Sequence, residues 1–346
     1  MKVFAILTRF LHHKPDGGYK RLLSEFEEIP ELQVTEFGND ETNELFPRTR
    51  IDKLQSRYKW LAEWRAWKYA MTQQPDLIHI MYGEEYFRFG HRLFTGTPLI
   101  ATFHQPSDVL DSELRQGDHG GRIAGFAHRI NKNRFQSLAA AIVTNPDQKV
   151  VLEQFMPEDK IHVIPLGVDV RASVATNDSA RKGILTLGNW FRDWDLYLKV
   201  VERMPAQQFH LVNRQLPSEV ADKVGSLPNC TYHKDIGDTA LHELIHRCHS
   251  AFLPLKKLAG SNALLELLAG GLPIIMSNAN AGVWRQYSPE CVALFESKNV
   301  EQAVKLLEQK IGSTSFAHRA ECIEIAKSFS WESAAERTYQ LYQNVT

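Results

Sequence analysis

The chain has 346 residues and a formal net charge of -1, and 43% of its residues are hydrophobic while 23% are charged. This length predicts two domains, and the near-neutral charge gives no indication of nucleic acid or of a strongly anionic membrane as the main partner. No run reaches the ~20 consecutive apolar residues that a membrane-spanning helix requires.

Two features bear on the compartment in which the protein works. Residues 1–13, MKVFAILTRFLHH, place a lysine before a short apolar run, but the small-residue cleavage site of a secretion signal does not follow. We therefore predict a buried first strand here. The cysteines lack CxxC spacing, which indicates reduced thiols and a cytoplasmic location; they are Cys230, Cys248, Cys291 and Cys322.

Short apolar strands alternate with helices along the first half of the chain. The predicted strands are KVFAILT, LQVTEFG, DLIHIMY, PLIATFH, AAAIVTN and KIHVIPL, and amphipathic segments occupy residues 19–28 and 51–72. Apolar strands separated by helices are typical of a parallel sheet that is covered on both faces. The pattern predicts a first α/β domain over residues 1–168.

The alternation starts again after a stretch without pattern. Residues 171–182, RASVATNDSARK, show no apolar periodicity, and the strands GILTLGN, FHLVNRQ, CTYHKDI, SAFLPL, LPIIMSN and VALFES follow. We predict a linker over 169–182, a second α/β domain over 183–330 and a tail helix over 331–346. A ligand is expected in a cleft between the two sheets, at the carboxyl ends of their strands.

The common phosphate-binding and nucleophile motifs are absent from the sequence. It contains no GxGxxG after a strand, no GxxxxGK[ST] and no GxSxG. Asp193-Trp194-Asp195 has the DxD spacing of a metal site found in one class of sugar transferase. The three residues stand at the expected start of a helix, so we interpret the two acids as a helix cap and a first-turn charge.

One carboxylate stands in an apolar helical run, LAGSNALLELLAGGLPIIMSN, over residues 258–278. Gly260, Ser261 and Asn262 begin that helix, and amides at a helix start suit an anion or a sugar hydroxyl. Glu266 lies four residues beyond Asn262, on the same face. It is either a solvated surface residue or a carboxylate that pairs with ligand hydroxyls, and its leucine neighbours favour the second interpretation.

This stretch resembles the donor-site signature of retaining glycosyltransferases with the GT-B fold, of the group 1 or family four type. ELLAGGLPII is similar to the second half of that signature. Further landmarks follow the family's order: KPDGGYKRLL, DLIHIMYG, PLIATFH, AAIVTNPDQKVVLEQF with KIHVIPLGVDV, and FSWESAAERTYQLY. The resemblance implies two Rossmann-like, doubly wound α/β domains facing a cleft, with the C-terminal helix crossing back onto the first domain.

The chain departs from the family at the residues that hold the donor. The first signature glutamate falls at Leu258, and the Gly-Arg and lysine that clamp the diphosphate fall at Gly188-Asn189 and Trp194. A bound diphosphate requires positive charge, which Arg192 or Lys256-Lys257 could restore. A role on the protein surface is the alternative for each of these cations.

The resemblance also implies the reaction. A hexosyl- or related glycosyltransferase (EC 2.4), independent of metal and cofactor, moves a sugar from a nucleoside diphosphate sugar to an acceptor hydroxyl with retention. The implied catalytic residue is His104, beside the sugar, whose alternative is a histidine bonded to the backbone at a strand end. The implied donor-binding residues are Gly17, Gly18, Asn189, Arg192, Lys256, Gly260, Ser261, Asn262 and Glu266.

The acceptor class stays open between a glycan, a lipid-linked molecule and a small molecule, so a peripheral membrane contact is compatible with the sequence. Two other functions also stay open. The protein could be a degenerate homologue that binds a nucleotide or glycan without turnover, or a nucleotide-sugar epimerase of the same fold. Donor hydrolysis would separate the first from a transferase, and the tail helix favours a transferase over the epimerase.

Overall fold

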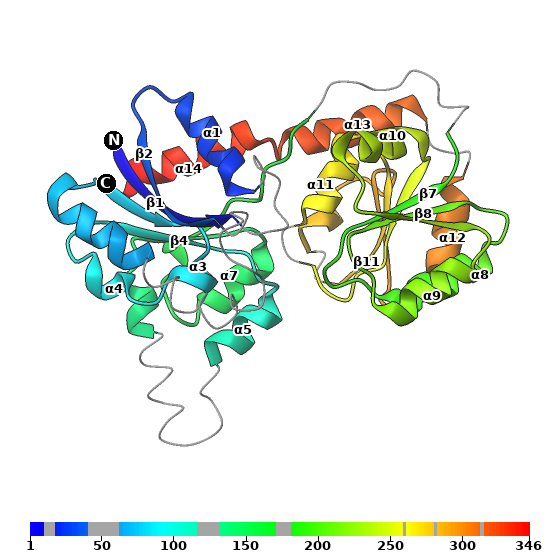
Figure 1. Ribbon diagram of the computed structural model, residues 1–346, viewed down its shortest axis with the longest axis horizontal. Helices are drawn as coiled ribbons and strands as arrows, with labels where there is room; N and C mark the ends of the chain where they lie inside the picture. The colour runs from blue at the N-terminus through cyan, green and yellow to red at the C-terminus, as the bar shows by residue number, and fades with distance from the viewer. Residues whose placement is uncertain are drawn as a thin grey trace. The chain divides into compact units, whose positions relative to one another are not determined.

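The computed structural model describes residues 1–9, 18–40, 62–115, 132–170, 181–258, 261–279, 282–311 and 315–346. The chain divides into two compact units (Figure 1): Met1–Leu166 together with Trp331–Thr346, and Gly167–Ser330. Each unit holds a six-stranded sheet whose paired strands are parallel. The predicted α/β fold class with two doubly wound units is therefore confirmed, while residues 171–180 of the predicted linker lie outside the described part.

The sheet of the first unit has the strand order β2-β1-β3-β4-β5-β6. Its strands are β1 (Lys2–Arg9), β2 (Gln33–Asp40), β3 (Leu77–Ile80), β4 (Leu99–Phe103), β5 (Ala140–Val143) and β6 (Ile161–Val163). Every residue of β3, β4 and β5 is buried, which explains why these strands are apolar on both faces. The order reverses between β1 and β3, where ligands of such sheets commonly bind.

The helices of the first unit cover both faces of its sheet. They are α1 (Tyr19–Glu27), a helix over 62–73, α3 (Gly83–Tyr86), α4 (Gly90–Leu93), α5 (Ser107–Arg115), α7 (Pro146–Leu152) and α14 (Trp331–Val345), with a 3-10 turn at Glu158–Lys160. Helix α1 buries Tyr19, Leu22, Leu23 and Phe26, which is the spacing of one helical face. Residues 51–61, the start of the helix predicted over 51–72, lie outside the described residues.

The tail helix α14 is part of the first unit, as the sequence predicts. It lies beside α1 (Figure 1), and the rings of Phe26 and Tyr342 are 5.7 Å apart. The Tyr342 hydroxyl also lies 2.6 Å from Nδ1 of the buried His79 on β3. The tail helix thus packs against the core of the first unit through both apolar and polar contacts.

The sheet of the second unit has the order β12-β11-β10-β7-β8-β9. The strands are β7 (Ile184–Leu187), β8 (Phe209–Asn213), β9 (Cys230–Lys234), β10 (Ser250–Leu253), β11 (Ile274–Ser277) and β12 (Val292–Phe295). The helices are α8 (Trp194–Arg203), α9 (Ser218–Ser226), α10 (Asp238–Arg247), α11 (Asn262–Ala269), α12 (Val300–Lys310) and α13 (Phe316–Lys327), with a 3-10 turn at Gly282–Gln286. The order reverses between β7 and β10, so the loops that follow these two strands meet at the carboxyl edge of the sheet.

None of the helices in the described ranges has both the length and the apolar character needed to cross a bilayer.

Candidate functional site

In the first unit, His104 stands directly after β4, at the carboxyl edge of the sheet. Next to it lies α3, which carries Glu84. Helix α3 approaches β4 closely because Gly83 has no side chain: a Cβ there would lie 2.6 Å from the Phe103 ring. This close approach places the Glu84 carboxylate under the loop that contains His104.

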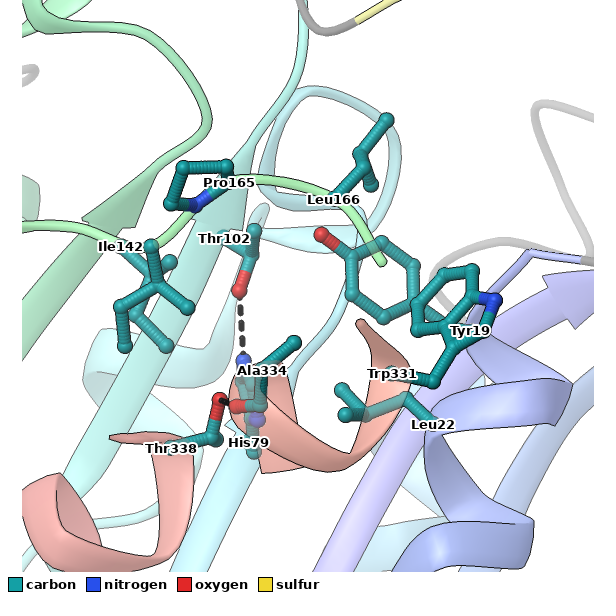
Figure 2. Close-up of a pocket in the computed structure, with 11 residues that line it drawn as sticks. Tyr19, Leu22, His79, Thr102, Ile142, Pro165, Leu166, Trp331, Ala334 and Thr338 are labelled. Atoms are coloured by element: carbon teal, nitrogen blue, oxygen red, sulfur yellow. Dashed lines mark hydrogen bonds between the residues drawn. The ribbon is translucent and has the colours of Figure 1, made fainter. Parts of the chain in front are cut away.

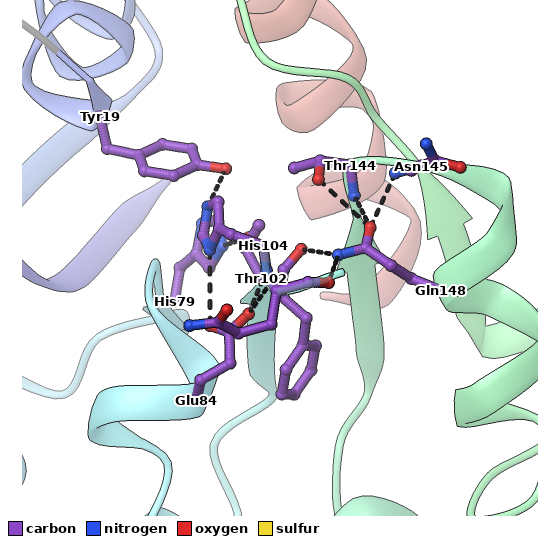
Figure 3. Close-up of polar contacts among 10 residues, drawn as sticks. Tyr19, His79, Glu84, Thr102, His104, Thr144, Asn145 and Gln148 are labelled. Atoms are coloured by element: carbon purple, nitrogen blue, oxygen red, sulfur yellow. Dashed lines mark hydrogen bonds and ion pairs between the residues drawn. The ribbon is translucent and has the colours of Figure 1, made fainter. Parts of the chain in front are cut away.

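The Glu84 side chain binds the backbone of the loop that contains His104 (Figure 3). The Oε1 atom accepts hydrogen bonds from the backbone N–H of His104 and from that of Gln105, the latter at 2.8 Å. The Oε2 atom lies 3.5 Å from Nδ1 of the His104 ring. Both oxygens of the Glu84 carboxylate therefore contact the same loop.

The Glu84 carboxylate stays ionised at neutral pH. Burial by itself would raise its pKa, since only 5% of the side chain is exposed. The hydrogen bonds from His104, together with its charge when the ring is protonated, act in the opposite direction and outweigh burial, so the pKa lies below its ordinary value. A buried carboxylate with such partners is a fixed acceptor.

Gln148 holds the same loop from the other side. Its Nε2 donates to the carbonyl oxygens of Phe103 at 3.2 Å and Gln105 at 2.7 Å. Its Oε1 accepts from the backbone N–H groups of Thr144 and Asn145, both at 2.8 Å, within the capping box that begins α7. Glu84 and Gln148 together fix the backbone on both sides of His104 (Figure 3).

Tyr19 completes the surroundings of His104. It is the first residue of α1, directly after Gly18, whose φ of +64° is in the left-handed region that favours glycine. Its hydroxyl lies 2.7 Å from Nε2 of His104. Burial, followed by the neighbouring Tyr82 and Glu84, raises the pKa of Tyr19 well above its ordinary value, so the hydroxyl keeps its proton.

A cavity of about 10 Å³ lies next to these residues, between α1, α14 and the ends of β3 and β4 (Figure 2). One wall is His79, whose Nε2 lies 2.7 Å from Oγ1 of Thr102. Burial, with a smaller contribution from His104, lowers the pKa of His79 to about 3, so the ring is neutral. The space holds one water at most, and we attribute it to packing rather than to a ligand site.

In the second unit, the loop after β7 is held together by Arg192. Its Nε and Nη2 donate to the carbonyl oxygen of Leu187 at 3.2 and 2.5 Å, and its Nη1 donates to that of Trp190 at 2.9 Å. The residue is 7% exposed, and burial lowers the pKa of the guanidinium to about 10, which leaves it charged at neutral pH. Arg192 is thus a buried cation inside the loop.

The loop requires glycine at position 188. Gly188 has a φ of +102°, and a Cβ there would lie 2.4 Å from Nη2 of Arg192 and 3.4 Å from Cβ of Ala263. Ala263 belongs to the first turn of α11. The bare backbone of Gly188 therefore lies between the Arg192 guanidinium and the start of α11.

Hydrogen bonds connect this loop to the loops after β8 and β10. The Asp193 N–H donates to the Pro254 carbonyl, and the Lys256 N–H donates to that of Phe191, both at 2.7 Å. On the other side, Oδ1 of Asn189 accepts from the Arg214 N–H at 3.1 Å. Three loops at the carboxyl edge of this sheet thus form one connected backbone network.

The start of α11 carries the remaining predicted donor residues. Ser261 is the N-cap, and its hydroxyl accepts from the Leu264 N–H at 3.4 Å. Asn262 is exposed, and Glu266 is partly buried. Its four leucine neighbours are buried, namely Leu264, Leu265, Leu267 and Leu268.

The structure places the other predicted residues as follows. Gly17 and Gly260 lie outside the described residues. Lys256 is exposed, while Nζ of Lys257 lies 5.9 Å from the centre of the Phe191 ring. Asp193 is the N-cap of α8 and its carboxylate accepts from the Leu196 N–H, so the capping interpretation is confirmed. The predicted donor-binding roles are not tested by these positions and stay predictions.

Sequence reasoning missed Glu84, Gln148 and Tyr19. The string NPDQ over 145–148 is a readable helix start, but it does not reveal that Gln148 reaches the β4 loop. No comparable signal marks Glu84, because its partner His104 follows 20 residues later on another element.

Comparison with known proteins shows which family part of the chain resembles and which fold it shares. Residues 31–172 match the model of glycosyltransferase family 4. The chain is also 23% identical over 279 residues to the MMP alpha-(1->4)-mannosyltransferase of Mycolicibacterium hassiacum, a match that covers 72% of this chain. It covers 66% of that relative, slightly less than two thirds of its length.

Solved structures share the fold over almost the full length. A sucrose-phosphate synthase from Thermosynechococcus elongatus has a TM-score of 0.75 at 17% identity, with 99% of this chain and 98% of that chain covered. Anabaena HepE in complex with UDP has a TM-score of 0.73 at 11% identity, with 99% and 100% covered. The chain therefore has the GT-B fold, and its residues 31–172 are similar to glycosyltransferase family 4.

Proposed function

We propose that the protein transfers a sugar from a nucleoside diphosphate sugar to an acceptor hydroxyl, with retention at the anomeric carbon and without a metal. The observation that carries this proposal is the junction of Gly188 with the first turn of α11 in the second unit. The start of α11 lies beside a bare glycine backbone there, an arrangement that suits a phosphate group.

In this proposal, Arg192 supplies the positive charge that neutralises the diphosphate. Its three hydrogen bonds to loop carbonyls use three of the five N–H groups of a guanidinium, so two more are available for a phosphate oxygen. Asn189 uses Oδ1 for Arg214, which leaves its amide NH2 to donate a neutral hydrogen bond. The exposed Lys256 is the reserve cation.

The nucleoside and the sugar have separate partners in this proposal. Glu266, on the same face of α11 as Asn262, accepts hydrogen bonds from the two ribose hydroxyls. His104 in the first unit contacts a hydroxyl of the transferred sugar. The protein contributes positioning and stabilisation of the departing diphosphate, without a nucleophile of its own.

Metal independence is supported by the Asp193-Trp194-Asp195 segment. The carboxylate of Asp193 caps α8 and accepts a hydrogen bond from the backbone of Leu196. A carboxylate engaged in this way is a poor candidate for the DxD role. We therefore assign charge neutralisation to Arg192 rather than to a bound cation.

The relatives indicate the donor class. HepE structures contain UDP or UDP-glucose, and the curated relative is a mannosyltransferase by its name. We infer that the donor here is a nucleoside diphosphate hexose and that the acceptor is a glycan, a lipid-linked sugar or a small hydroxylated molecule. A cytoplasmic place in glycan, glycolipid or glycoconjugate biosynthesis fits this reaction.

A ligand screen tests the proposal. Thermal unfolding is measured with UDP, GDP and ADP, with their glucose conjugates, and with the free nucleosides as controls. A ligand at 100 times its Kd stabilises the folded protein by ~2.7 kcal/mol, so a specific nucleoside diphosphate should raise Tm clearly above its nucleoside. Absence of any such shift contradicts the proposal.

A non-catalytic homologue is the second candidate, because Asn189 and Trp194 replace the family's arginine and lysine and Arg192 is engaged by its own loop. Both candidates predict nucleotide binding. Slow hydrolysis of the bound nucleotide sugar in the absence of acceptor, measured with the best ligand of the screen, supports the transferase. Binding without turnover, with every acceptor class supplied, favours the homologue.

A further inference from the structure

The two oxygens of Glu84 have different partners within the first unit. Oε1 accepts from two backbone N–H groups, those of His104 and Gln105, which fixes the carboxylate in place. Oε2 faces Nδ1 of the His104 ring at 3.5 Å. The carboxylate therefore accepts hydrogen bonds from the loop backbone through Oε1 and faces the imidazole ring through Oε2.

This arrangement determines which ring nitrogen carries the proton. An ionised carboxylate only accepts hydrogen bonds, so the nitrogen that faces it is favoured as the N–H. The proton of a neutral His104 ring then belongs on Nδ1, and Nε2 keeps its lone pair. That lone pair is the acceptor for the Tyr19 hydroxyl, which lies 2.7 Å away and retains its own proton.

We propose that Glu84 is a positioning residue that keeps the His104 proton on Nδ1, so that Nε2 accepts a hydrogen bond from a hydroxyl of the transferred sugar. Tyr19 supplies that hydrogen bond in the free protein, and the sugar hydroxyl replaces it. This inference rests on the proposed function for the identity of the ligand, while the position of the proton is a property of the protein alone.

Glu84→Gln is the discriminating variant. The amide oxygen of glutamine can still accept from the two backbone N–H groups, so the loop keeps its main support. The amide NH2 then faces Nδ1 and donates to it, which moves the ring proton to Nε2. Nε2 becomes a donor, and it can no longer accept from a sugar hydroxyl.

Glu63→Gln is the matched control. Glu63 is also a buried carboxylate of the first unit, and it accepts from the backbone N–H groups of Arg88, Phe89 and Gly90 at 3.1, 2.9 and 2.8 Å. These bonds hold the start of α4, and none of them involves a histidine. The same chemical change there tests whether loss of a buried carboxylate is sufficient to disturb His104.

The experiment reads the tautomer by NMR on the full-length protein labelled with 15N-histidine, with His104→Gln used to assign the His104 signals. We expect Nδ1 protonated and Nε2 unprotonated in the wild type, in Glu63→Gln and in Tyr19→Phe, and the reverse in Glu84→Gln. A wild-type ring protonated on Nε2 overturns the proposal, and so does an unchanged tautomer in a folded Glu84→Gln.

Tyr19→Phe keeps the test decisive if Glu84→Gln does not fold, because this variant leaves the Glu84 carboxylate in place. A His104 tautomer that changes in Tyr19→Phe would show that Tyr19 determines the position of the proton, and would overturn the proposal.

Hydrolysis of UDP-glucose is the second readout. A wrong histidine tautomer costs up to about 10⁴-fold in kcat where the ring transfers the proton. Here the ring only accepts a hydrogen bond, and we expect kcat/KM to fall about 10- to 100-fold in Glu84→Gln, with UDP affinity unchanged. If NMR gives the expected tautomers but the protein binds no nucleotide sugar, the proposed function is contradicted, while the effect of Glu84 on the His104 proton is still supported. Unchanged kcat/KM in a variant whose tautomer has reversed would remove the positioning role and leave the function standing.

Discussion

The hydroxyl of Tyr19 lies 2.7 Å from Nε2 of His104, on the side of the ring opposite Glu84. The imidazole is therefore held between a hydroxyl and a carboxylate, while Glu84 and Gln148 fix the backbone that carries it. In the free protein Tyr19 occupies the hydrogen-bonding position that we propose for a sugar hydroxyl.

Tyr19→Phe is expected to strengthen binding of the nucleotide sugar. The variant removes the group that competes for Nε2, and the ligand hydroxyl then supplies a donor to this partly buried nitrogen. A net hydrogen bond contributes ~0.5–1.5 kcal/mol, so the affinity for UDP-glucose should rise roughly 2- to 10-fold. Titration calorimetry measures this, and UDP alone, which lacks the sugar, should bind the variant and the wild type equally.

Glu63→Gln is expected to flatten the pH dependence of stability. Burial is the largest effect on Glu63 and raises its pKa from 4.5 to about 7, although three backbone hydrogen bonds act against it. The folded protein therefore holds a proton that the unfolded chain has lost between these values, and the wild type loses stability as pH rises from 4.5 to about 7.

Since each pKa unit corresponds to about 1.4 kcal/mol, the loss is on the order of 3 kcal/mol. Thermal unfolding at pH 5 and pH 8 checks this prediction. The Tm of Glu63→Gln, relative to the wild type, should be higher at pH 8 than at pH 5. A difference that is the same at both pH values would show that Glu63 does not titrate in this range.

Arg192→Ala should have two separable effects. Removal of the guanidinium leaves the buried carbonyl of Leu187 and the partly buried carbonyl of Trp190 without this donor, so we expect a loss of stability of ~1–3 kcal/mol. If the charge also contacts the donor, binding of a nucleoside diphosphate weakens far more than binding of the nucleoside, and this difference shrinks at high salt.

Lys256→Ala is the control for the stability effect, because Lys256 is exposed and its loss should not change Tm. Equal losses of affinity for nucleoside and nucleoside diphosphate in Arg192→Ala would show that Arg192 supports the loop without contacting phosphate. The measurements are thermal unfolding and calorimetric titration at two salt concentrations.

Gly188→Ala should be more damaging than its size suggests. The residue has a φ of +102°, and an added Cβ would lie 2.4 Å from Arg192 Nη2. Backbone strain of this kind costs ~1–3 kcal/mol, and displacement of the guanidinium adds to it. Calorimetry should show lower stability and weaker diphosphate binding together. Gly225→Ala, where a Cβ in helix α9 meets no other atom within 4 Å, is the control and should lower neither.

The fold could be predicted because buried parallel strands are apolar on both faces. The segments DLIHIMY and PLIATFH contain β3 and β4, and every residue of these strands is buried. The tail helix could be predicted from its amphipathic pattern, and the Asp193 cap from its position before an apolar run. These features depend on the local sequence.

The His104 environment could not be predicted, because its contacts join elements that are far apart in the chain. Tyr19 and His104 are 85 residues apart, and Gln148 lies 45 residues beyond Phe103. The bonds of Arg192 are local, but they depend on the backbone turn at Phe191, whose φ of +55° no residue pattern reveals. A branched network of buried polar contacts is visible only in three dimensions.

The central claim, that α11 binds the nucleoside of a nucleotide-sugar donor, is tested most directly by calorimetric titration of the wild type and Glu266→Ala with the nucleoside diphosphate that stabilises the wild type most. Hydrogen bonds to a charged group contribute ~1.5–3 kcal/mol, so we predict that the variant binds roughly 10- to 150-fold more weakly. Equal affinity of a folded Glu266→Ala variant and the wild type would contradict this account.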